Sequence, residues 1–191
     1  MATTNNKANV STTRGVQGGY IFRAPVGTAG APTGVEWTPG DGWVCLGYIA
    51  EDGFTEGVSQ DNSTELRDIN RDLLDDVSGN FTETLQLALM EVAKEPLSVY
   101  YGSENVADAS GVLSVVHNWG KSDETMQYVL LLLLKNDRKW TKYIPQGKVT
   151  DREDFTGNKT TAAQHGVTIT YTTNDNGDGC FDWFESTETH L

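Results

Sequence analysis

The sequence predicts a mostly β domain, a β-sandwich or partly open barrel with one short flanking α-helix. Apolar and polar residues alternate over long stretches, which is typical of strands with one buried face. Short candidate strands follow one another between turns rich in Gly, Asn and Asp. Only one stretch has helical character. The chain has 191 residues, enough for a single domain with a sizeable core.

The first third of the chain is interpreted from local composition. Residues 1–18 are small and polar and are expected to form a flexible N-terminal arm. A strand is predicted at Gly19–Arg23, followed by a long loop over 24–43 that is dense in Gly and Pro. A second strand is predicted at Val44–Ala50. The next stretch, 51–64, reads as an acidic, polar connection.

Period-two alternation persists longest between Leu73 and Met90. One parity is largely apolar and ends with Leu85, Leu87 and Leu89. The other parity is polar at Asp76, Ser78, Asn80, Thr82, Thr84 and Gln86. A single strand of this length would span roughly 60 Å, so two strands joined by a bend near Ser78–Gly79, or a bulge, are predicted.

The one predicted helix is KEPLSVYYG at 94–102, with Pro96 in its first turn and Gly102 at its C-terminal cap. The later strands are predicted at Val112–Val116, Met126–Lys135, Trp140–Ile144, Lys148–Phe155, Ala163–Thr172 and Gly179–Phe184. The run VLLLLL at 129–134 has no polar face, so the helix or a neighbouring subunit is expected to cover its second side. Residues 19–186 are predicted to form one domain, and 187–191 a C-terminal tail.

Charge is unevenly distributed along the chain. The net charge of −13 argues against a surface that grips nucleic acid, because phosphate binding needs clustered Lys and Arg. Runs of like charge along a chain are usually solvated faces. Separated patches of opposite sign on one chain also suit head-to-tail self-association. The candidates for a subunit interface are the acidic Glu51, Asp52, Glu56 and Asp61 and the basic Lys135, Arg138, Lys139 and Lys142.

The segment NDNGDGCFDWFE at 174–185 resembles the calcium loop of an EF-hand. Asn174 stands where a carboxylate is expected, and the flanking VTITYTT and FDWFE alternate like strands, which leaves no place for helices. A hairpin turn is therefore preferred to a calcium site. His117, His165 and His190 are too scattered for a metal spacing, and no catalytic motif is present. The sequence predicts no enzyme, no cofactor and no metal.

Five segments, in matching order, resemble the major tail tube proteins of bacteriophages with long, non-contractile tails. They are GGYIFRAPVGTAGAPT (18–33), VCLGYIAEDGFTEGVSQD (44–61), FTETLQLALMEVAKEPLSVYYG (81–102), IPQGKVTDREDFTG (144–157) and HGVTITYTTNDNGDGCFDWFE (165–185). The stretch 104–125 has no recognised counterpart. The alternative from another class is a monomeric extracytoplasmic β-module that binds calcium or carbohydrate. No secretory signal is recognised, which weighs against that alternative.

The resemblance implies a helix-flanked β-sandwich that forms six-membered rings stacked into a hollow tube, similar to the tube of the type VI secretion system. DNA would pass through the tube at infection without specific binding, and no membrane is implied. Further implied partners are the tape measure protein, the tail terminator and the distal tail protein. The implied location is the phage tail of the virion, with assembly in the host cytoplasm. A channel wall for DNA should not attract phosphate, so the lumen candidates are Asp76, Ser78, Asn80, Thr82, Thr84 and Gln86.

Overall fold

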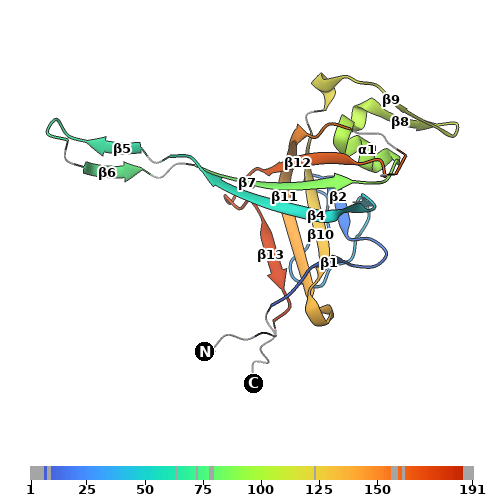
Figure 1. Ribbon diagram of the computed structural model, residues 1–191, viewed down its shortest axis with the longest axis horizontal. Helices are drawn as coiled ribbons and strands as arrows, with labels where there is room; N and C mark the ends of the chain where they lie inside the picture. Colours follow the sequence, from blue (N-terminus) through green and yellow to red (C-terminus); the bar gives the residue numbers. More distant parts are fainter. Residues whose placement is uncertain are drawn as a thin grey trace.

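The computed structural model describes residues 7, 10–62, 64–71, 73–77, 80–122, 124–155, 159–160 and 162–186. A curved body carries one long hairpin that projects away from it (Figure 1). The body is built on a nine-stranded antiparallel sheet that is open and not closed into a barrel, which confirms the predicted fold class. The strand order is β3 (Val44–Cys45), β2 (Ile21–Pro25), β10 (Thr125–Leu133), β11 (Lys139–Arg152), β12 (His165–Tyr171), β7 (Phe81–Leu89) and β4 (Ile49–Gln60).

Two short strands complete the sheet beside the long strands β10 and β11. β1 (Arg14–Gly15) pairs with the end of β10 that extends past its pairing with β2. Part of the N-terminal segment 1–18, which was predicted to be flexible, is therefore a strand. β13 (Phe181–Phe184) pairs with Trp140–Tyr143 of β11, whereas β12 pairs with the other end of β11. Both are antiparallel to β11, so β13 continues in the direction of β12 after the turn. The predicted closing hairpin is therefore wrong, because these two strands do not pair with each other.

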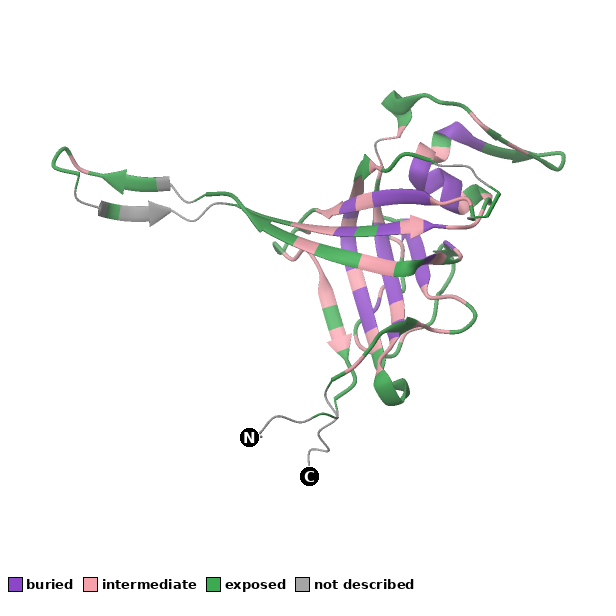
Figure 2. Ribbon diagram, in the orientation of Figure 1, coloured by how far each residue is buried: buried purple, intermediate pink, exposed green. Residues whose placement is uncertain are grey.

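The core lies on the inner face of the curved sheet (Figure 2). Leu85, Leu87 and Leu89 are buried there, as the alternation predicts. The α-helix α1 (Lys94–Tyr101) packs Val99 and Tyr100 against the same core. The predicted helix is confirmed. It ends at Gly102, whose φ of 94° is readily adopted only by glycine.

The loop over 26–43 covers the outer face of β10. Trp43 is buried against Phe22 and Val129, and Trp37 packs against the same cluster. The indole N–H of Trp43 donates to the Ala29 carbonyl at 3.1 Å, which fixes the ring within its own loop. The prediction that the helix or a neighbouring subunit covers this face is therefore wrong, since the chain supplies the cover itself.

A hairpin that we call the arm extends β4 and β7 beyond the body. It consists of the outer ends of β4 and β7 together with β5 (Thr64–Arg67) and β6 (Leu73–Val77), which pair with each other. The prediction of two strands between Leu73 and Met90 is confirmed, and Ser78 and Gly79 lie outside the described residues. The predicted acidic connection at 51–64 is wrong, because most of it is β4.

The remaining elements are short. β8 (Val106–Ala109) and β9 (Val112–Val115) form a separate hairpin beside α1, within the stretch that has no recognised counterpart. The 3-10 turns described in full are η2 (Ser103–Asn105), η3 (Trp119–Lys121) and η4 (Lys135–Asp137). The two strands predicted between Trp140 and Phe155 are the single strand β11. In the described part of the chain, no helix has the length and apolar character that crossing a membrane requires.

Candidate functional site

The predicted polar face of β7 lies opposite the core. Thr82 and Gln86 are exposed and Thr84 is half-buried, while the leucines of the other parity, at 85, 87 and 89, are buried. Asn80 is exposed just before the strand. Asp76 lies in β6, but its side chain is outside the described part, and Ser78 is outside it altogether. The structure thus places Thr82, Thr84 and Gln86 on one surface.

The neighbouring strands extend this surface with residues of the same kind. Thr168 and Thr170 of β12 lie opposite Gln86 and Thr84, and Thr55 and Ser59 of β4 lie opposite Gln86 and Thr82. Directly opposed residues of antiparallel strands share a face. Thr150 of β11 joins them, with 2.6 Å between its hydroxyl oxygen and that of Thr170. We call this surface the hydroxyl face: Thr55, Ser59, Thr82, Thr84, Gln86, Thr150, Thr168 and Thr170.

Most of the hydroxyl face was missed from the sequence. The regular alternation of Thr168 and Thr170 marks a polar strand face, but strand pairing, which joins it to Thr84, is not visible in local patterns. The face also carries charge that the analysis of one strand did not include. Lys148 lies opposite Thr170 in the ladder, and Glu153 accepts a hydrogen bond from the Gln86 amide at 2.6 Å.

Lys142, predicted at a subunit interface, lies inside the subunit. Its side chain is 1% exposed, and its ammonium is 2.6 Å from Glu56 Oε1 and 2.7 Å from Asp182 Oδ2. The Tyr171 hydroxyl donates to the same Glu56 oxygen at 3.0 Å. Burial lowers the pKa of Lys142, but its hydrogen bonds to Asp182 and Glu56 together outweigh burial, so the pKa is raised. This Lys142 cluster joins β4, β11 and β13 within one chain.

The neighbouring groups respond to the same environment. Burial raises the pKa of Cys180, whose sulfur is 3.5 Å from the Lys142 ammonium, to about 12. Burial also raises the pKa of Tyr171, and the adjacent Glu56 carboxylate raises it further. Both groups therefore stay protonated at neutral pH. The cluster holds one charged lysine between two carboxylates, so removing one partner would leave a buried or half-buried charge uncompensated, and it contains no activated nucleophile.

The other predicted interface residues divide into paired and unpaired groups. Lys139 is 2.5 Å from Glu36 Oε1 in an exposed ion pair. Glu51, Asp52 and Asp61 are exposed on β4 or just after it. Lys135 begins the η4 turn and Arg138 directly follows it, and neither makes an ion pair within the described residues. Within the described residues, an exposed acidic group on β4 and a basic group at the η4 turn therefore remain without ion pairs, although Arg138 is half-buried and donates to the Glu185 carbonyl at 3.3 Å.

The calcium-like segment is a tight turn that uses its own oxygens. The Asn174 side-chain oxygen accepts the backbone N–H groups of Asn176 and Asp178, each at 2.9 Å. Gly177 has a φ of 88° and donates its N–H to the Asn174 carbonyl at 2.9 Å. Across the residues that the structure describes, no group of three or more His, Cys, Asp or Glu side chains is placed to hold a metal ion.

Comparison with known proteins supplies one match. A family profile described as "Phage tail tube protein" matches residues 2–190, almost the whole chain. A search of curated proteins finds no match.

Proposed function

The chain belongs to the phage tail tube protein family, whose members are structural and not enzymatic, and we propose that six copies form a ring and that the rings stack into a tube that conducts DNA. Self-assembly into a tube and a place in the virion follow from family membership. The six-fold ring, the passage of DNA at ejection and assembly in the host cytoplasm are the proposed additions.

The hydroxyl face is the proposed lining of the channel, and it is the observation that best supports the function. Its side chains are uncharged donors and acceptors that water solvates well. They provide no apolar patch for bases to stack on and no cluster of cations for phosphates. The net charge of −13 favours the same outcome, because it repels a polyanion.

Lys148, the lysine that the described residues place beside this face, is compatible with such a lining. Lys148 is half-buried and already engaged in an interaction within the chain. Glu153, which holds the Gln86 amide, adds a negative charge on the same side. Asp151 is exposed opposite Thr168 and adds a second carboxylate. Among the described residues that we place on this side, one cation therefore faces two carboxylates, which gives no continuous cationic stripe along the proposed channel.

Two features support the association of subunits. β4 pairs only with β7, so within the described residues its outer edge is free to add a strand from another subunit. Glu51, Asp52 and Asp61 are exposed on or beside β4, Lys135 is exposed at the start of the η4 turn, and the half-buried Arg138 directly follows that turn. We assign these patches to contacts between subunits. Lys142 and Glu56 are excluded from them because they pair inside one chain.

The experiment adds two lysines to the proposed lining, Thr82→Lys with Thr84→Lys. The matched control is Val112→Lys with Ser114→Lys, which has the same spacing on exposed positions of β9. Both variants should form tubes, because all four positions lie outside the core. Only the first should slow DNA ejection, most strongly at low salt, because repeated cations in a channel bind phosphate. Equal ejection rates for both phages would contradict the proposal.

A further inference from the structure

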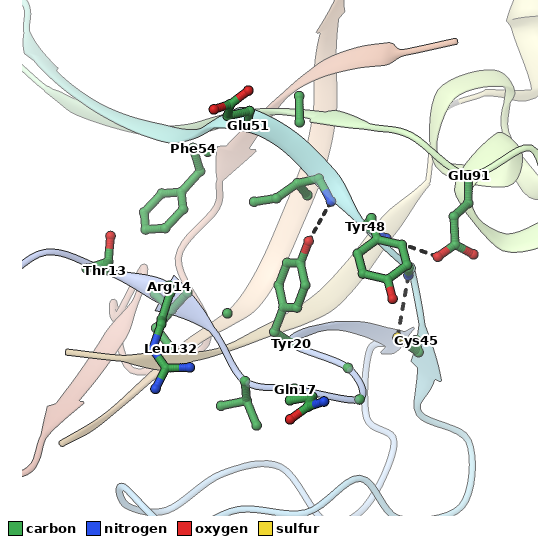
Figure 3. Close-up of a pocket in the computed structure, with 18 of the residues that line it drawn as sticks. Thr13, Arg14, Gln17, Tyr20, Cys45, Tyr48, Glu51, Phe54, Glu91 and Leu132 are labelled. Carbon is green, nitrogen blue, oxygen red and sulfur yellow. Dashed lines mark hydrogen bonds between the residues drawn. The ribbon is translucent and has the colours of Figure 1, made fainter. Parts of the chain in front are cut away.

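β4 is connected to the strands across the core by individual side chains. At its beginning, a cavity of about 630 Å³ lies between β4 and β1 (Figure 3). The Tyr20 hydroxyl reaches across from the β1 side and accepts the backbone N–H of Ile49 at 2.7 Å. Further along β4, Phe54 packs against Trp140 of β11, with 5.9 Å between the ring centroids. Each of these contacts therefore matters for where β4 lies relative to the body.

A second cavity, of about 230 Å³, lies where the arm leaves the body. Its lining includes Glu56 and Val58 of β4, Glu83 of β7 and Tyr171 of β12. β7 pairs with β12 as far as Thr84, and beyond that residue the described chain pairs it with β4 alone. From this point the arm is a two-stranded ribbon, which is marginally stable by itself and twists readily.

The apolar core ends at the same place. Leu85 of β7 is completely buried, whereas Val58 and Phe81, which follow on the same face of the arm, are 68% and 66% exposed. Glu56 lies directly opposite Leu85 in the ladder and therefore shares its inner face. Burial of apolar side chains thus does not fix the direction of the arm beyond the pair formed by Glu56 and Leu85.

Glu56 contacts the strands across the core where the arm begins. Its Oε1 is 2.6 Å from the Lys142 ammonium and 3.0 Å from the Tyr171 hydroxyl. Lys142 is 1% exposed, so water screens its charge poorly and the attraction exceeds that between two surface groups. Asp182 of β13, 2.7 Å from the same ammonium, holds Lys142 from the side of the body. Glu56 therefore connects an arm strand to a charge that the body itself keeps in place.

We propose that Glu56 is a positioning residue, whose contact with Lys142 and Tyr171 sets the angle between the arm and the body. The ion pair draws the base of the arm toward β11 and β13, on the inner side of the sheet. Because the arm projects away from the body, a small change of angle at its base displaces its tip by a larger distance (Figure 1). The direction of the arm decides which neighbouring subunit it can reach, and this last step rests on the proposed tube.

The test measures the direction of the arm in the unassembled subunit. Spin labels on Leu74→Cys in the arm and Val92→Cys in the body report the distance between the two parts, and the native side chains are 63% and 65% exposed. Cys45→Ser and Cys180→Ala remove the natural thiols from every sample. With Glu56 present, the distribution of distances should be narrow. Glu56→Ala should broaden or shift it, because a ribbon without this contact samples many angles.

The matched control is Asp182→Ala, which removes the other carboxylate from the same ammonium. Asp182 also accepts the indole N–H of Trp140 at 2.6 Å, so its loss should lower the urea midpoint at least as much as Glu56→Ala does. Since Asp182 lies on β13 and not on an arm strand, the distribution of distances should stay narrow. A role in stability alone would not separate the two variants in this way.

Tube assembly provides a second readout. If Glu56→Ala leaves about a tenth of the subunits with the arm at the required angle, the concentration needed for assembly rises about tenfold. Asp182→Ala should change this concentration much less. Glu56→Gln keeps an oxygen that can accept both hydrogen bonds, so its arm distribution and its assembly should lie between those of the wild type and Glu56→Ala.

Two results would refute the positioning role. The first is an identical distribution of distances for the wild type and Glu56→Ala, which would leave the proposed tube intact. The second is equal broadening in Glu56→Ala and Asp182→Ala, which would assign the effect to a general loss of stability. A wild-type protein that never forms tubes would refute the proposed function instead, and the distances in the unassembled subunit would still decide the role of Glu56.

Discussion

Replacing Lys142 by methionine should destabilise the isolated subunit more than any other single charge removal among the predicted interface residues. Lys142 is 1% exposed, and its partners Glu56 and Asp182 are 35% and 32% exposed. Methionine fills similar space but leaves two half-buried carboxylates without a cation. Breaking a buried ion pair costs about 3–5 kcal/mol, and the partial exposure of the carboxylates places this case near 3 kcal/mol.

The assay is urea unfolding of the unassembled subunit, followed by fluorescence. For a chain of this size a loss of about 3 kcal/mol corresponds to a fall in melting temperature of roughly 6–12 °C. The denaturant slope should be unchanged, because the substitution alters the interaction and not the compactness of the fold.

The matched control is Lys139→Met. Its ion pair with Glu36 is exposed, with side chains that are 46% and 73% accessible, so the loss should stay below about 1 kcal/mol. Adding Glu56→Gln and Asp182→Asn to Lys142→Met should restore much of the stability, because no uncompensated charge remains. The reasoning is refuted if Lys142→Met is no more destabilising than Lys139→Met.

Four further outcomes are expected. Burial lowers the pKa of His165, so its contribution to the stability of the subunit should be complete above about pH 6.5 and should decline as the pH falls further. The urea midpoints at pH 7.5 and pH 5.5 should therefore differ less in His165→Phe than in the wild type. Gly147→Ala should cost about 1–3 kcal/mol in the same assay, because its Cβ would lie 2.8 Å from Ile169 Cγ2, whereas Gly34→Ala, with nothing within 4 Å, should be neutral. Calorimetry should detect no calcium binding by the wild type or by Asp178→Ala. Saturable calcium binding by the wild type that is lost in the variant would show that the segment 174–185 is a calcium site after all. Lys135→Glu with Arg138→Glu should reduce tube yield without unfolding the subunit, and a normal yield would remove the η4 turn from the interface.

The fold was predictable wherever one strand face is buried within the subunit. Leu85, Leu87 and Leu89 alternate with polar residues because one side of β7 meets the core and the other meets solvent. The helix was predictable from Pro96 and Gly102, which mark its two ends. In both cases the physical cause is local and leaves a periodic pattern in the sequence.

The sequence-based predictions failed where the contact that determines the structure involves residues far apart in the chain. β4 leaves the body and enters the arm, where it has no core to cover, so its residues lack apolar alternation and read as a connection. The partner of Lys142 is set by the pairing of β13 with β11, and no local pattern shows that Asp182 comes within 2.7 Å of it. The hydroxyl face is spread over four strands, so only the part on β7 was found.

The most direct test of the central claim is an electron cryo-microscopy reconstruction of the assembled tube. The account predicts that Thr82, Thr84, Gln86 and Thr170 face the axis of the channel, with the leucines of β7 behind them in the subunit core. A reconstruction in which these four residues lie on the outer wall, or are buried between subunits, would contradict it.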